Sequence, residues 1–173
     1  MRHANIATSA ASLLLTASAA ATAADPPAAR CTAAEMRQFD FWVGEWTVTD
    51  RGKLAGHNRI ERILGGCALL ENWSGAAGGA GKSLNFFDSD DARWHQTWID
   101  ASGGALFLAG RFENGAMRLE GERSASGETP ATRHRITWTP LDDGRVRQLW
   151  ESTPVGREQW SVQFDGLYVR EDN

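Results

Sequence analysis

Three segments of the chain each place one polar side chain between two large apolar side chains, at a spacing of two residues. Residues two apart in an extended strand point to the same face, so each polar group would lie among apolar neighbours. A carboxyl group there has a raised pKa and can transfer protons, whereas an amide can orient a bound molecule through hydrogen bonds. The pattern predicts a cavity with aromatic walls and a few polar groups, lined by Glu71, Trp73, Trp94, Gln96, Trp98, Gln148 and Trp150.

These residues are compatible with three functions. A largely apolar small molecule could occupy the cavity, or Glu71 could act as a general acid or base while Gln96 or Gln148 positions a substrate. Alternatively, the polar groups hydrogen-bond one another in a filled core, and the protein acts through its surface. We expect binding of an unidentified small hydrophobic molecule and no catalytic residue, because the sequence offers no nucleophile with a base and an orienting group.

Metals and cofactors require patterns that the chain lacks. His95 and His134 fall in separate predicted strands, without Cys or His at a zinc-binding spacing nearby. The acidic run Asp88-Ser89-Asp90-Asp91 lacks the rest of a calcium-binding loop. No glycine-rich phosphate loop precedes a helix, and no Gly-x-Ser-x-Gly segment occurs. The sequence therefore predicts no metal site and no cofactor.

From Phe41 onward, the chain consists of short runs with period-two alternation, separated by turn residues. Glu113-Asn114-Gly115 and Asp142-Asp143-Gly144 are typical of hairpin turns, because Asn, Asp and Gly tolerate positive φ. The expected strands cover residues 46–49, 57–64, 68–74, 82–87, 94–100, 105–112, 116–121, 132–139, 145–151 and 158–169.

About ten strands joined by short turns predict an all-β fold in which sequence neighbours pair antiparallel. An up-and-down barrel removes exposed sheet edges and, at this strand number, encloses a cavity, so we favour it over a two-sheet sandwich. In the last strand, the alternation places Trp160, Val162 and Phe164 on one face. A short helical turn is expected within residues 33–39, before the barrel.

The chain has 173 residues, of which 42% are hydrophobic and 23% are charged. This is the composition of a globular protein, which argues against disorder. A net charge of −4 offers no basic surface for nucleic acid. We expect a single barrel domain over residues 39–173, a lead-in at residues 24–38, and a monomer.

The N-terminus has the features of a secretory signal. Arg2 precedes an Ala-rich apolar run, no acidic residue occurs before Asp25, and Ala21-Thr22-Ala23 offers a small-residue cleavage site. The apolar core is too short to span a membrane, so residues 1–23 are expected to be removed. The sequence thus predicts a periplasmic or secreted protein without membrane insertion.

Export makes Cys31 and Cys67 natural disulfide partners, since exported proteins fold in an oxidising compartment. The alternative, a reactive thiol, needs a lowered thiol pKa and a nearby base, and neither cysteine has a His in its local sequence. We expect the bridge, which would join the lead-in to the start of a strand.

The string Phe39-Asp40-Phe41-Trp42-Val43-Gly44-Glu45-Trp46 contains the Gly-x-Trp motif that opens lipocalin-like barrels. With residues 65–73, 94–100 and 146–148, it resembles an uncharacterised family of exported bacterial lipocalin-like proteins among the calycins. The resemblance covers residues 39–170 and implies a ten-stranded barrel in which Arg170 packs on Trp46, beside Gly44. It implies no activity and no catalytic residue.

A more distant resemblance is to the haem-binding nitrobindin group, which shares the barrel and the opening Gly-x-Trp. In that group, a His near the C-terminal end holds the haem. The histidines of this chain are His3, His57, His95 and His134, none of them in the last predicted strand. The resemblance therefore implies the barrel without haem binding.

Overall fold

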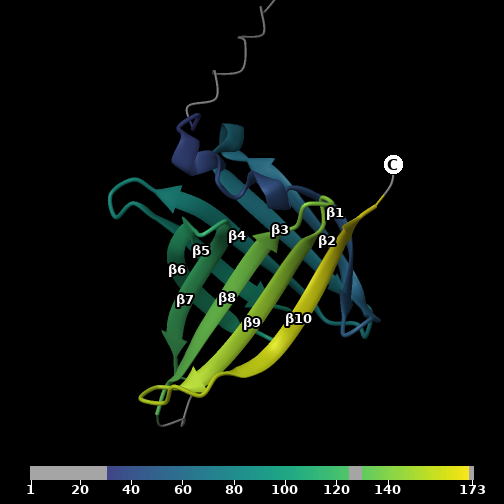
Figure 1. The fold of residues 1–173 in the computed structure, drawn as a ribbon, viewed down its shortest axis with the longest axis vertical. Helices are drawn as coiled ribbons and strands as arrows, with labels where there is room; N and C mark the ends of the chain where they lie inside the picture. Colours follow the sequence, from purple (N-terminus) through teal and green to yellow (C-terminus); the bar gives the residue numbers. More distant parts are fainter. Residues whose placement is uncertain (1–30, 125–129, 172–173) are drawn as a thin grey trace, which may run out of the picture.

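The computed structural model describes residues 31–124 and 130–171, so the expected signal at residues 1–23 lies outside the described residues. Within these ranges, the chain forms ten β-strands and three short 3-10 helices (Figure 1). The strands are β1 (Gly44–Asp50), β2 (Lys53–Ile63), β3 (Ala68–Gly75), β4 (Ala80–Asp88), β5 (Arg93–Asp100), β6 (Ala105–Glu113), β7 (Ala116–Arg123), β8 (Thr132–Pro140), β9 (Val146–Pro154) and β10 (Ser161–Arg170), and the helices are η1 (Ala34–Arg37), η2 (Asp40–Trp42) and η3 (Leu64–Gly66).

Each strand pairs antiparallel with its neighbours in sequence, and β1 also pairs antiparallel with β10, which closes the sheet into a barrel. This confirms the predicted all-β, up-and-down barrel and excludes the two-sheet sandwich. The observed strands extend the predicted ones by a few residues at some ends, because pairing continues into the polar residues that flank each run. None of the helices in the described ranges has the length and apolarity needed to cross a membrane.

The hairpins occur where turn residues predicted them. Asn114 and Gly115 connect β6 to β7, and their φ angles are 50° and 79°. Positive φ at both central residues is the requirement of a type I′ turn, whose twist matches that of the flanking strands. Gly144, in the turn between β8 and β9, has a φ of 81°.

The segment from η1 to η2, here called the N-terminal plug (residues 34–42), lies across one end of the barrel (Figure 1). Phe39 and Trp42 in this segment are completely buried and stack with their ring centroids 4.9 Å apart. The Phe39 ring also meets the rings of Trp94 and Trp138, at 5.5 Å and 5.2 Å. Large aromatic side chains therefore fill this end of the barrel and seal it.

Three residues close the barrel beside the plug in the way that the lipocalin-like resemblance implies. The Arg170 guanidinium lies 4.3 Å from the centroid of the buried Trp46 ring and donates a hydrogen bond to the Val43 carbonyl at 3.0 Å. Gly44 has a φ of 141°, and a Cβ at this position would overlap the Arg170 side chain. The cation–π contact contributes about 0.5–2 kcal/mol to holding the first and last strands together.

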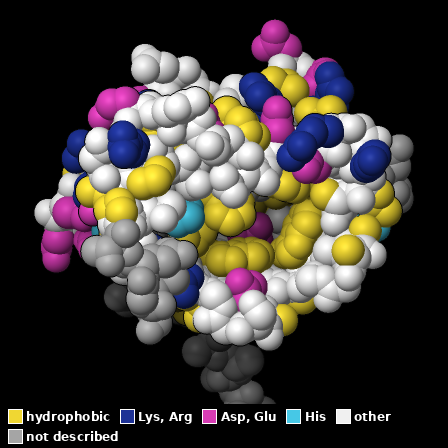
Figure 2. Space-filling view, turned by 90° about the horizontal axis from the view of Figure 1, so that it is seen from below, with side chains coloured by type: hydrophobic (Ala, Val, Ile, Leu, Met, Phe, Trp, Pro, Cys, Tyr) yellow, Lys and Arg dark blue, Asp and Glu magenta, His cyan; other side chains and the backbone are white. Residues whose placement is uncertain are grey.

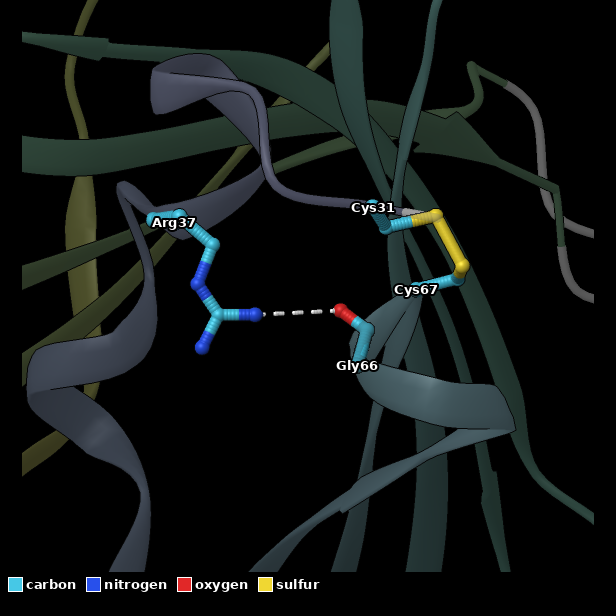
Figure 3. The surroundings of a disulfide bond; sticks show 4 residues. All are labelled: Cys31, Arg37, Gly66 and Cys67. Carbon is cyan, nitrogen blue, oxygen red and sulfur yellow. Dashed lines mark hydrogen bonds between the residues drawn. A yellow bond between two sulfur atoms is a disulfide. The ribbon is translucent and has the colours of Figure 1, made fainter. Parts of the chain in front are cut away.

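Cys31 and Cys67 form a disulfide, with their Cα atoms 5.0 Å apart, which confirms the predicted bridge. Beside it, the Arg37 guanidinium donates a hydrogen bond to the Gly66 carbonyl at 3.3 Å (Figure 3). The bridge therefore ties the chain that leads into the plug to the end of η3, where β3 begins.

The side chains at the start of β10 depart from the predicted alternation. The pairing register shifts between Val162 and Phe164, where one extra residue is inserted into the strand. Val162 is 51% exposed, whereas Phe164 packs against the core, and the Trp160 ring lies outside, 4.0 Å from the Arg135 guanidinium. The predicted common face for Trp160, Val162 and Phe164 is wrong, because a bulge reverses the alternation.

Candidate functional site

The barrel contains a cavity of about 210 Å³ at the end opposite the plug, where Figure 2 shows a hollow surrounded by hydrophobic side chains. A closed apolar cavity of about 150 Å³ is enough to hold benzene, so this one has room for an aromatic ring with a short substituent. Its lining comes from β3, β5, β6, β8, β9 and β10 and consists of Glu71, Trp73, Gln96, Trp98, Leu106, Ile136, Gln148, Trp150, Gln163, Phe164 and Tyr168.

The walls of the cavity are mainly aromatic. The rings of Trp73 and Phe164 meet edge to face, with centroids 6.2 Å apart and planes at 81°. Trp98 lies over β4 at Gly81, where an added Cβ would overlap its indole ring. The glycine thus provides the space that the Trp98 ring occupies in the cavity wall.

The polar part of the cavity is built around Glu71, whose side chain is only 4% exposed. Asn58 on β2 donates a hydrogen bond from its amide to Glu71 Oε1 at 2.7 Å. Ser83 on β4 donates from its hydroxyl to Glu71 Oε2 at 2.5 Å, and the two residues are directly paired across β3 and β4. Both carboxylate oxygens are therefore held by neutral donors from the two flanking strands.

The hydrogen bonds continue on both sides of this carboxylate. Asn85 donates to the Ser83 hydroxyl at 2.8 Å, and Gln96 donates to the Asn85 carbonyl oxygen at 2.8 Å. On the other side, Asn58 also donates to the Tyr168 hydroxyl at 3.3 Å, and that hydroxyl donates to the side-chain oxygen of Gln148. One buried network thus joins six strands at the base of the cavity.

Burial raises the pKa of Glu71 to about 6, against the lowering effect of the hydrogen bonds from Ser83 and Asn58. Burial also raises the pKa of Tyr168 well above its usual range, and the nearby Glu71 charge adds to this effect. At neutral pH, the Tyr168 hydroxyl is therefore neutral, and Glu71 is mostly ionised but takes up a proton when the pH falls to about 6.

The raised pKa of Glu71 predicts a specific dependence of stability on pH. The folded state holds the Glu71 proton more tightly than the unfolded chain does, so the contribution of Glu71 to stability is fully present below pH 4.5 and is lost as the pH rises through about 6. The shift corresponds to about 2 kcal/mol of unfolding free energy. Urea unfolding between pH 4 and 7 measures it: the difference between Glu71→Gln and the wild type should change by this amount in favour of the variant.

Any cost of the amide at position 71 that does not depend on pH shifts the whole curve of the variant and leaves its slope unchanged. Glu113→Gln is the matched control, since Glu113 is exposed at the end of β6. Parallel curves for the wild type and Glu71→Gln across this range would show that Glu71 does not titrate with a raised pKa.

A second hollow of about 310 Å³ adjoins the cavity, because both are lined by Trp98, Leu106 and Trp150. Its remaining wall is more polar and includes the charged side chains of Asp100 and Arg123. His134 lies in the same wall and accepts a hydrogen bond from the Trp150 indole at 3.2 Å. Ala105 and Thr132 complete the lining of this second hollow. A molecule that extends beyond the cavity would thus meet charged groups next to the aromatic wall.

The structure brings six of the seven sequence-predicted lining residues together around the cavity: Glu71, Trp73, Gln96, Trp98, Gln148 and Trp150. The seventh, Trp94, lies closer to the plug, where its indole donates to the Glu35 carbonyl at 3.2 Å and its ring packs on Phe39. Trp94 is the inward-facing residue that precedes Gln96 in β5, and it therefore belongs to the sealed end of the barrel and not to the cavity.

The polar partners that hold Glu71 in place were not predicted from the sequence. Asn58, Ser83 and Asn85 are buried, although polar residues at alternate positions usually indicate the solvent face of a strand. Tyr168 was missed as well, although period-two alternation places it on the same face as Phe164, four residues earlier in β10. The other lining residues absent from the prediction are Leu106, Ile136, Gln163 and Phe164.

One group of side chains in the described ranges could in principle hold a metal ion. Ligand atoms of Asp88, Asp91 and His95 lie within 4.8 Å of one another near the turn between β4 and β5. Asp88 accepts the Asp90 backbone N–H at 2.9 Å, and Asp91 contacts the His95 ring at 2.9 Å. These contacts are those of a capped turn with a side-chain hydrogen bond between Asp91 and His95, so we assign no metal to it.

Neither protein-family models nor curated proteins give a match to this chain.

Proposed function

We propose that this protein binds a small molecule with an apolar, ring-sized body in the barrel cavity. The observation that supports the proposal most directly is the cavity of about 210 Å³, whose walls are aromatic and whose polar groups gather around Glu71. Binding sites for small molecules typically combine apolar walls with a few placed polar groups that fix orientation. A filled core, as expected for a protein that acts only through its surface, would leave no such space.

We also propose that the chain is an exported calycin-like protein. The closed barrel and the packing of Arg170 on Trp46 support the calycin-like part of this proposal. The disulfide between Cys31 and Cys67 supports export, because such bridges persist in oxidising compartments. The secretory signal expected at residues 1–23 is the second observation that supports export.

A cavity-filling substitution tests the binding proposal. Leu106 is 8% exposed and faces both hollows, so Leu106→Trp should occupy the space that a ligand needs. In calorimetric titration, 2-phenylethanol should bind the wild type, and its affinity for the variant should fall at least about tenfold. Native mass spectrometry of the protein from its producing cell should in addition detect a retained small molecule.

Leu84→Trp is the matched control, because Leu84 is 38% exposed on the outer face of β4 and the substitution is the same. This variant should bind 2-phenylethanol like the wild type. Equal loss in both variants would assign binding to the outer surface. The binding proposal fails if no molecule is retained from the cell and the folded wild type binds no small aromatic molecule.

Catalysis by Glu71 is the second candidate, and its position at the cavity favours it, since its pKa of about 6 suits proton transfer near neutral pH. Glu71→Gln separates the two functions. A binding protein retains its affinity for a neutral ligand, whereas an acid–base enzyme loses turnover by orders of magnitude.

A further inference from the structure

Glu71 is a buried carboxylate that faces a cavity without a basic partner. No Lys, Arg or His belongs to the described lining of the 210 Å³ cavity, and no ion pair of Glu71 occurs among the described residues. A buried charge without a counter-ion is costly, and proteins generally pair such charges. A positively charged group on a molecule in the cavity would supply the partner that the described lining lacks.

The hydrogen-bond network has a direction that favours the ionised form of Glu71. Gln96 donates to Asn85, and Asn85 donates to the Ser83 hydroxyl, which also receives a second N–H from Gln96 at 3.4 Å. The acceptor positions of Ser83 are thus occupied, and its single proton is directed to Glu71. Asn58 donates to the other oxygen, so both oxygens act as acceptors, as a carboxylate requires.

Capacity for a ligand remains on the carboxylate. Each carboxylate oxygen has about two acceptor sites, and one contact to each is present, from Asn58 to Oε1 and from Ser83 to Oε2. An ammonium group has three donors and no acceptor, so it matches the remaining sites and supplies the positive charge. A ligand carboxylate would instead be repelled by Glu71.

The walls of the cavity favour the same charge. Trp73, Trp98, Trp150 and Phe164 surround the space next to Glu71, and the faces of aromatic rings attract cations. The attraction is stronger for rings that are partly withdrawn from water, and these four rings are half-buried. The aromatic walls and the carboxylate thus select an organic cation together.

We propose that the cavity takes a small organic amine, with its ammonium group paired to Glu71 and its apolar body between the tryptophan rings. This inference rests on the proposed binding function and specifies the chemical class of the ligand.

The pairing makes binding depend on pH. Tyr168 is the titratable side chain that faces Glu71 from β10, and its hydroxyl stays neutral. Glu71 is also faced by Asn58 from β2 and by Ser83 from β4, and neither of these side chains is charged. Protonation of Glu71, whose pKa is about 6 in the free protein, removes the counter-ion. The affinity for an amine that stays charged should therefore fall about tenfold for each pH unit below this value.

Three probes of one shape test the inference by calorimetric titration at pH 7.5: 2-phenylethylamine, 2-phenylethanol and phenylacetate. The amine should bind at least about tenfold more tightly than the alcohol, since hydrogen bonds to charged groups are the stronger ones, and phenylacetate should bind least. Glu71→Gln should weaken amine binding by about 10- to 100-fold and change the affinity for the alcohol little. Glu113→Gln, at an exposed position, should leave all three affinities unchanged.

The wild-type pH profile of amine binding needs no variant, so it tests the inference even if Glu71→Gln fails to fold. The inference is overturned if the alcohol or phenylacetate binds as tightly as the amine, or if amine affinity does not fall below pH 6. Binding of the alcohol without preference for the amine would leave the binding function in place. Failure of all three probes to bind, together with the absence of any small molecule retained from the producing cell, would overturn both proposals.

Discussion

Trp42→Ala is expected to lower the free energy of unfolding by about 4 kcal/mol, which is the usual range for removing a buried tryptophan. The Trp42 ring is completely buried in the N-terminal plug and contacts Phe39, Trp138 and Tyr168 at centroid distances of 4.9, 5.3 and 6.3 Å. The rigid barrel around it cannot collapse into the space that the ring leaves, so the lost contacts are not replaced. Urea unfolding followed by tryptophan fluorescence measures the loss.

Trp160→Ala provides a matched control with the same change of side chain. The Trp160 ring lies on the outside, with the Arg133 and Arg135 guanidinium groups 5.2 Å and 4.0 Å from its centroid. Trp160 is half-buried, so its removal should cost about 1–2 kcal/mol, the range of cation–π contacts that are partly withdrawn from water. Equal losses for the two variants would contradict the view that the plug stabilises the barrel through its buried aromatic rings.

The barrel could be predicted from the sequence because its turns and strands carry independent signals. Asn114-Gly115 and Gly144 mark turns through their positive φ, and short apolar runs lie between such turns at regular intervals. Alternation within β5 correctly placed Gln96 and Trp98 on the inward face, since this strand continues without a bulge. Local rules are sufficient where each strand keeps a constant register with its neighbours.

The polar network could not be predicted, since its inward residues look like those of a solvent-facing strand. In β4, Ser83 and Asn85 point inward and are buried, whereas Leu84 between them is 38% exposed. This inversion exists because Glu71 on the adjacent strand needs hydrogen-bond donors, which is a property of the pairing between strands. The alternation of residue types within β4 alone therefore does not predict that its polar side chains point inward. The bulge near Phe164 has the same consequence, because nothing in the residue types of β10 marks the inserted residue.

The polar network around Glu71 is retained next to the cavity although a buried carboxylate lowers the stability of the fold. Filling the same volume with apolar side chains would avoid the desolvation of Glu71, and such replacements of buried charges often stabilise proteins. The chain instead keeps a carboxylate with a pKa of about 6 beside an open aromatic cavity. Buried ionisable groups with shifted pKa values are typical of sites that bind or react, which supports our proposal that ligands bind at this end of the barrel.

Replacement of both cysteines, Cys31→Ala with Cys67→Ala, is expected to lower the free energy of unfolding by about 4 kcal/mol. The two cysteines are 36 residues apart, and in the chain-entropy model the bridge stabilises the protein by restricting the unfolded chain over this loop. The folded contacts of the plug are unaffected, because Phe39 and Trp42 are held by ring packing and Arg37 by its bond to Gly66. Urea unfolding of the oxidised wild type and the double variant measures the difference.

The same variant should bind 2-phenylethanol and 2-phenylethylamine with unchanged affinity, because the cavity lies at the opposite end of the barrel from the bridge. Intact mass with and without reductant establishes that the wild type carries the bond before the comparison is made. A loss below about 1 kcal/mol would show that the unfolded chain gains little freedom when the bridge is absent. A loss of ligand affinity in the folded double variant would instead show that the plug controls the shape of the cavity, and the two ends of the barrel would then have to be treated as one coupled unit.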